Sequence, residues 1–246
     1  MIASSKKYTT RIGILVHGRH LETKNWEEIV WGKPPTKLGS LPMMVLVALH
    51  RGVENIAKVV FGSGASEKDG LKESEYILRY LKNKMARIGE FDHIRNHPRF
   101  ESYHDLQLLG NLMNTIECQK TSKNTMEEIA DAAKVFSKAG IADVIEITCA
   151  SHAPRCIRDQ AVAFEQGLIP QNQLWSIVHG MTTYAHTTAE EVVIIEPPHR
   201  GDDPMAKSKI KTHEIFSKLF YDIRETSVKI KTLRAIKTLV EKAVRD

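Results

Sequence analysis

The chain has 246 residues, of which 42% are hydrophobic and 26% charged, as in a soluble globular protein that is long enough to bury a full core. No apolar run approaches the roughly 20 residues that a membrane-spanning helix needs, and residues 1–7 lack the apolar core of a secretion signal. Three cysteines are too few for a disulfide framework, so reduced thiols are expected. We therefore expect a cytoplasmic protein with no membrane span.

The net charge of +5 is concentrated at the C-terminal end. Residues 205–246 contain eleven Lys and Arg against five Asp and Glu, a balance of +6, which leaves the rest of the chain near −1. The simplest interpretation is a solvated helix face, and the alternative is a surface for a partner or a nucleic acid. Few aromatic residues are interleaved with these cations, so we expect no nucleic-acid partner.

Short apolar runs, which predict strands, alternate with amphipathic segments, which predict helices. In chain order we expect strand 12–16, helix 42–50, strand 56–61, helix 73–85, strand 112–118, helix 125–140, strand 144–147, helix 154–166, strands 174–178 and 192–195, and helix 207–244. Between them, residues 89–110 are expected to form a long loop or lid. The alternation predicts an α/β fold with a mainly parallel sheet that is covered on both faces. We expect one domain over residues 1–246, with its core at about 11–200 and a basic helical extension at about 205–246.

The first polar segment at a strand end is Gly62-Ser63-Gly64, which follows the second predicted strand. Glycine there lets main-chain amides approach an anion, and the serine hydroxyl adds a hydrogen bond. The alternative is a plain structural turn. The segment does not match the P-loop pattern, and no G-x-G-x-x-G follows the first strand, which argues against a P-loop ATPase and an ordinary dinucleotide fold.

The second polar segment, Ser122-Lys123-Asn124-Thr125, stands at the predicted start of a helix. Unpaired amides and the helix dipole favour a negative group at such a position. The alternative is N-capping by Asn124 or Thr125 without any ligand.

The third and richest segment runs from Thr148 to Arg155, at the end of the fourth strand. His152 is suited to act as an acid, a base or a hydrogen-bond donor near neutral pH, and Arg155 offers a bidentate grip on phosphate or carboxylate. The carboxyl ends of the strands share one edge of an α/β sheet, which is where ligands bind. The three segments therefore predict a pocket for an anionic, phosphate-bearing or nucleotide-like small molecule.

Two alternatives use other residues. Cys149 and Arg155 are spaced as in the loop of cysteine-dependent phosphatases, in which a thiolate attacks phosphorus and the arginine holds the oxygens. The segment 196–204 contains His199 and two aspartates that could hold a divalent metal, but its prolines and glycine equally describe a surface turn. We favour a loop that lines the pocket there, and the expected function requires no metal.

Taken together, the segments resemble the DUF218 family over about residues 11–165. The matching residues are Gly62, Ser63 and Gly64 with Glu73, then Ser122, Asn124, Thr125 and Glu127, then Thr148, His152, Pro154 and Arg155. Gln119 stands where the family motif has glutamate, and Glu128 where it has asparagine. The resemblance implies a Rossmann-like three-layer αβα sandwich with a pocket at the strand ends, and it makes S-adenosylmethionine a candidate ligand.

From these observations we expect an enzyme that acts on a phosphorylated or nucleotide-like small molecule by hydrolysis or group transfer. His152 and Glu73 are the candidate catalytic residues. The candidate anion-binding residues are His17, Gly18, Ser63, Gly64, Ser122, Asn124, Thr125, Ser151, Arg155 and His199. The alternatives are a binding protein for such a ligand without turnover, and a phosphatase that uses Cys149.

Overall fold

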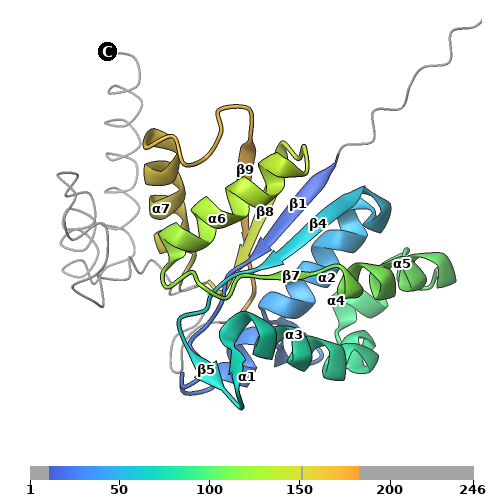
Figure 1. Ribbon diagram of the computed structural model, residues 1–246. Coiled ribbons are helices and arrows are strands. Elements are labelled where there is room, and N and C mark those ends of the chain that lie inside the picture. Colours follow the sequence, from blue (N-terminus) through green and yellow to red (C-terminus); the bar gives the residue numbers. More distant parts are fainter. Residues whose placement is uncertain (1–10, 151, 183–246) are drawn as a thin grey trace, which may run out of the picture. The chain divides into compact units, whose positions relative to one another are not determined.

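The computed structural model describes residues 11–150 and 152–182, and their centre is a five-stranded parallel sheet (Figure 1). The strands, in the order in which they lie side by side, are β7 (Glu117–Cys118), β4 (Ile56–Phe61), β1 (Ile12–Val16), β8 (Asp143–Thr148) and β9 (Leu174–His179). Every neighbouring pair runs parallel. The order moves outward from β1 in one direction through β4 and β7, and in the other through β8 and β9. The predicted α/β fold with a parallel sheet is therefore confirmed.

Helices and two small hairpins connect these strands. The helices are α1 (Trp26–Val30), α2 (Ser40–Arg51), α3 (Glu73–Lys84), α4 (Asp92–Arg95), α5 (Tyr103–Asn114), α6 (Thr125–Lys138) and α7 (Ala153–Glu165), with short 3-10 turns η1 (Val53–Asn55) and η2 (Met85–Glu90). The hairpins are β2 (Gly32–Lys33) with β3 (Lys37–Leu38), and β5 (Glu67–Lys68) with β6 (Leu71–Lys72).

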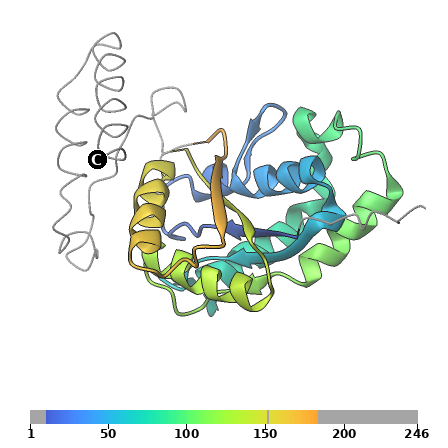
Figure 2. The same ribbon diagram turned by 90° about the horizontal axis from the view of Figure 1, so that it is seen from above.

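The sheet is covered on both faces, which gives three layers (Figure 2). On one face the alternate residues Ile12, Ile14 and Val16 of β1 join the large apolar cluster that includes most of α2. Helices α6 and α7 lie on the other face. There the ring of Phe136 packs against Gly13, and a Cβ at Gly13 would lie only 2.8 Å from that ring. Every residue of β1 is buried, as expected of a central parallel strand.

Helix α6 illustrates how the local sequence sets an element. Asn124 is its N-cap, and the side-chain oxygen accepts a hydrogen bond from the amide of Glu127 at 3.0 Å. Ile129, Ala132 and Phe136, spaced three and four residues apart, are fully buried against the sheet. The helix ends just before Gly140, whose φ of +68° suits glycine.

The region before α6 differs from the sequence-based expectation. Residues 89–110 were expected to form a loop or lid, but they contain α4 and most of α5, whose residues Ile94 and Leu109 are fully buried. The expected strand 112–118 is also wrong in its first half, because α5 continues to Asn114 and β7 has only two residues. Leu109, Leu112 and Met113 are spaced for one face of a helix, and packing of that face against the core decides the structure.

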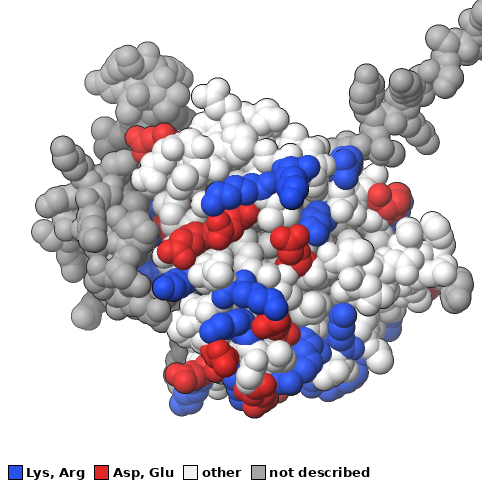
Figure 3. All heavy atoms as spheres, in the orientation of Figure 1, with Lys and Arg blue, Asp and Glu red and all other residues white. Residues whose placement is uncertain are grey.

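The described residues all belong to the first of two units, Met1–Val192 and Val193–Asp246, into which the chain divides. The expected strand 192–195, the loop 196–204 with His199, and the basic helix 207–244 lie outside the described residues, as does Ser151. Among the residues that the structure describes, no helix has the length and apolar character needed to cross a membrane. On the face drawn in Figure 3, Lys and Arg are interleaved with Asp and Glu rather than gathered in one patch.

Candidate functional site

The candidate site lies where β1, β4 and β8 end, at the carboxyl edge of the sheet. The amide of His17 donates to the carbonyl of Ile147 at 2.9 Å, and the amide of Gly62 donates to that of Val16 at 2.8 Å. The segments that follow the three strands therefore start side by side. The strand order reverses between β1 and β8, and this is the position at which open α/β sheets bind their ligands.

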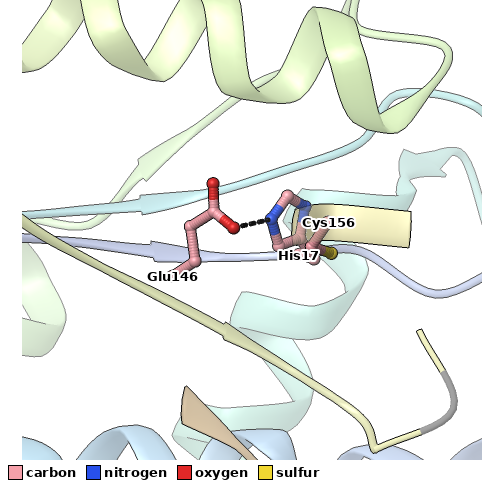
Figure 4. A group of neighbouring side chains, drawn as sticks. All are labelled: His17, Glu146 and Cys156. Atoms are coloured by element: carbon pink, nitrogen blue, oxygen red, sulfur yellow. Dashed lines mark ion pairs between the residues drawn. The ribbon is translucent and has the colours of Figure 1, made fainter. Parts of the chain in front are cut away.

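His17 occupies the centre of this edge, and its side chain is fully buried between two carboxylates. Nδ1 lies 2.7 Å from Oε2 of Glu128, which comes from α6. Nε2 lies 3.7 Å from Oε2 of Glu146, which comes from β8. Figure 4 shows the carboxylate of Glu146 pointing toward the imidazole ring, with Cys156 of α7 next to the ring.

Glu146 is a buried carboxylate in the middle of an apolar strand. Because its neighbours Ile145 and Ile147 point into the cluster on the α2 face, Glu146 points to the face covered by α6 and α7. Its side chain is fully buried, and neither carboxylate oxygen has a hydrogen-bond partner among the described residues. Burial raises the pKa of this carboxyl group.

Cys156 completes a compact group with these two residues. One nitrogen of His17, Sγ of Cys156 and one carboxylate oxygen of Glu146 all lie within 4.8 Å of one another. Burial raises the pKa of the Cys156 thiol to about 11. Burial also works against a charged His17 ring, but Cys156 and the carboxylates of Glu128 and Glu146 outweigh it and hold the pKa of His17 well above its ordinary value.

His152 stands at the N-cap of α7, beside His17. Its Nε2 lies 3.0 Å from the Thr125 hydroxyl, both side chains are buried, and the centroids of the two histidine rings are 5.7 Å apart. Burial lowers the pKa of His152 well below its ordinary value, and the charges of His17, Arg19, Arg155 and Arg158 lower it further. His152 is therefore neutral at pH 7 and lies in a positive field.

Glu73 begins α3 and reaches the same edge from the other side. The carboxylate accepts a hydrogen bond of 2.5 Å from the Ser66 hydroxyl, and only 1% of the residue is exposed. Burial raises its pKa to about 7, and the neighbouring Glu128 acts in the same direction. Gly18 is required here, because a Cβ at that position would collide with Glu73 and Ser63.

The turn after β4 is built by close approach of two loops. Gly64 packs directly on the carbonyl of Lys120, leaving no room for a side chain, and its amide donates to the carbonyl of Ser122 at 2.7 Å. Ser63 has a φ of +81°, and its hydroxyl accepts a hydrogen bond from the Ala65 amide at 3.1 Å. The Gly64 amide that was expected to face an anion is therefore used within the protein.

The loop before α6 is likewise held by internal bonds. The Ser122 hydroxyl lies 3.2 Å from Oε1 of Gln119 and 3.3 Å from a carboxylate oxygen of Asp131. Asn124 caps the helix, which is the alternative that needs no ligand, whereas Thr125 contacts His152. Of this segment, only Thr125 joins the group around His17.

The segment after β8 turns directly into a helix. The amides of His152 and Ala153 donate to the carbonyl of Cys149 at 3.0 and 3.2 Å, and the amide of Arg155 donates to the carbonyl of His152 at 3.1 Å. These amides are consequently unavailable to hold the oxygens of a phosphate, which is what the loop of a cysteine-dependent phosphatase must do. Cys149 itself is buried.

Three residues of the central group, Glu128, Glu146 and Cys156, were not predicted from the sequence. Two of them, Glu128 and Glu146, had a signal in the sequence. Glu146 is the only charged residue within the apolar run 144–147, and Glu128 lies on the face of α6 that also carries Ile129 and Ala132. A charge on a buried face is the informative exception to the hydrophobic pattern.

Comparisons of the chain with protein-family models, with curated proteins and with solved structures gave no match.

Proposed function

We propose that the chain is an enzyme that acts on a phosphorylated or nucleotide-like small molecule, by hydrolysis or group transfer, at the carboxyl edge of its sheet. The observation that carries the proposal is the environment of His152. A neutral imidazole lies among Arg19, Arg155 and Arg158, whose charges lower its pKa. Such a field favours a phosphate or carboxylate ligand, and the neutral ring can accept a proton from a reacting group.

Glu73 would be the second acid–base group. A carboxyl group with a pKa of about 7 can give or take a proton at neutral pH, which an ordinary glutamate with a pKa near 4.5 does poorly. The Glu73 side chain lies against Gly18, directly after β1. The charge of Arg19 lowers the pKa of Glu73, but burial raises this pKa by more. Glu73 and His152 therefore approach the end of β1 from α3 and α7 respectively.

The motif resemblance to the DUF218 family supports the same class of ligand, and membership of that family is part of the proposal.

A specific observation favours the second candidate, a protein that binds a ligand such as S-adenosylmethionine without turnover. Gln119 stands at the glutamate position of the family motif, and its amide is already engaged. It donates to the carbonyl of Glu128 at 3.0 Å and accepts from the Ser122 hydroxyl at 3.2 Å.

A thermal-shift screen followed by product analysis tests the proposal. The panel contains nucleotides, sugar phosphates, isoprenyl phosphates and S-adenosylmethionine, each with and without a divalent metal. A ligand at a hundred times its dissociation constant stabilises the folded chain by about 2.7 kcal/mol, which the screen detects. A stabilising compound that is consumed supports the enzyme, one that survives unchanged supports the binding protein, and no stabilisation by any compound contradicts both.

Arg155→Ala gives the matched test of where the ligand binds. Loss of a charged hydrogen bond to an anion weakens affinity by roughly 10-fold to 100-fold. Arg51→Ala is the control, because Arg51 is exposed at the end of α2, beside the start of β4 and thus at the opposite edge of the sheet. Equal affinities for the two variants would contradict the proposed location.

A further inference from the structure

His17, Glu146 and Cys156 form a buried group that has no role in the proposed acid–base chemistry of His152 and Glu73. A nitrogen, a carboxylate oxygen and a thiol sulfur lie within 4.8 Å of one another, and all three residues are buried. They come from the end of β1, from β8 and from α7. Imidazole, carboxylate and thiolate are the three side-chain ligand types of zinc sites in proteins.

We propose that His17, Glu146 and Cys156 form a binding site for a divalent transition-metal ion, with zinc as the ion that best suits these ligands. A thiolate selects zinc over magnesium or calcium, which prefer oxygen ligands only. The proposal does not depend on the proposed substrate, because metal binding can be measured without any turnover.

The first argument is the spacing of the ligand atoms. Nε2 of His17 and Oε2 of Glu146 are 3.7 Å apart, which is too long for a hydrogen bond. Zinc bonds of about 2.0–2.3 Å in a tetrahedral site place neighbouring ligand atoms roughly 3.3–3.6 Å apart. The observed spacing of this pair is therefore close to that of two ligands on one ion, and the pair needs only a small contraction.

The second argument is the set of polar atoms without hydrogen bonds. Nε2 of His17 and both carboxylate oxygens of Glu146 are buried and have no hydrogen-bond partner among the described residues. Buried polar atoms without a partner are rare in folded proteins, and an ion is one of the ordinary explanations. A metal ion between Nε2 and the carboxylate would satisfy both residues.

The third argument is the orientation of His17. Its Nδ1 lies 2.7 Å from Oε2 of Glu128, so that carboxylate holds the Nδ1 proton and Nε2 is the ring nitrogen that faces the proposed ion. Metal-bound histidines almost always donate the other ring N–H to a carboxylate, a main-chain carbonyl or water, and this bond fixes the tautomer and the ring orientation. Glu128 is thus the positioning residue of the proposed site.

The fourth argument is charge balance. A doubly charged cation bound by one thiolate, one carboxylate and one neutral imidazole gives a neutral buried group. The Cys156 thiol and the protonated Nε2 of His17 each release a proton to solvent when the metal–sulfur and metal–nitrogen bonds form, as metal binding requires. Three protein ligands leave a fourth position on a tetrahedral ion for water or another ligand.

Cobalt(II) is the probe for the test, because a cobalt–thiolate bond absorbs in the near ultraviolet. The full chain is stripped of metal with a chelator under reducing conditions and titrated with Co²⁺, and zinc is then added as a competitor. We expect one equivalent of cobalt to bind with a thiolate charge-transfer band, and zinc to abolish that band. Absence of a thiolate band in the unaltered chain overturns the proposal, whatever the variants do.

Variants identify the ligands. Cys156→Ala should abolish the band, and Cys118→Ala, which alters a cysteine of the edge strand β7, should retain it. Glu128→Gln should weaken cobalt binding by roughly 10-fold to 100-fold while keeping the band, as expected for a positioning residue. Glu146→Gln, which alters a proposed ligand, should weaken cobalt binding further than Glu128→Gln does. Circular dichroism checks that each variant folds. A band that survives in Cys156→Ala, or affinity unchanged in both glutamate variants, overturns the assignment.

Discussion

Replacing Glu73 by glutamine tests the electrostatics of the candidate site. Glutamine has the shape of glutamate and still accepts the hydrogen bond from the Ser66 hydroxyl, but it cannot ionise. The substitution therefore imitates the protonated carboxyl group. Any difference between the two chains that depends on pH comes from ionisation of Glu73.

The size of the effect follows from the pKa of Glu73. Burial raises it from 4.5 to about 7, so the folded chain holds this proton more tightly than the unfolded chain. The protonated group contributes its full stability below pH 4.5, and that contribution is lost as the pH rises to about 7. At about 1.4 kcal/mol per pKa unit, the loss amounts to about 3 kcal/mol. Glu73→Gln keeps this stability at all pH values.

The assay is urea unfolding of both chains between pH 4.5 and pH 8. We expect Glu73→Gln to gain about 3 kcal/mol in the free energy of unfolding, relative to the unaltered chain, as the pH rises across this range. Glu67→Gln, at an exposed position in β5, is the control and should differ by no more than about 0.5 kcal/mol at any pH. A difference for Glu73→Gln that stays constant with pH, or that falls as the pH rises, would refute the argument.

Three further predictions concern stability, each measured by urea unfolding at one pH. Gly18→Ala should cost about 1–3 kcal/mol, because its methyl group collides with Glu73 and Ser63; an unchanged stability would mean that this packing is wrong. Asn124→Ala should cost about 1 kcal/mol through loss of the N-cap of α6, and no loss would argue against that cap. Gly110→Ala, within α5 and with open space around it, should instead stabilise the chain by about 0.5–1 kcal/mol; destabilisation would contradict a helix there.

The central strands could be predicted because their signals are local. Runs such as 12–16 and 56–61 are apolar and rich in β-branched residues, and the structure has strands with the same bounds. Residues 103–118 could not be predicted in this way. Leu112 and Met113 look like the start of a strand in isolation, and only the buried position of Leu109 one turn earlier identifies a helix.

The candidate site was predicted in its position but only partly in its members. The carboxyl ends of the parallel strands β1, β7 and β8 lie at one edge of the sheet, so His17, Thr125 and His152, which follow these strands, could be expected near one another. The partners of His17 could not be predicted from the order of the strands. Glu128 and Glu146 lie inside a helix and a strand, and only the packing of α6 on β1 and β8 brings them to the ring.

The most direct test of the proposed function is the ionisation of His152, followed by imidazole NMR on the full chain. In the free protein the pKa of His152 lies well below its ordinary value, partly because of three arginines. The compound that stabilises the chain most in the thermal-shift screen is added, and the histidines are titrated again. We predict that the pKa of His152 rises when an anionic ligand binds, because the negative charge favours the protonated ring. A stabilising anionic compound that leaves the pKa of His152 unchanged would contradict the proposed site.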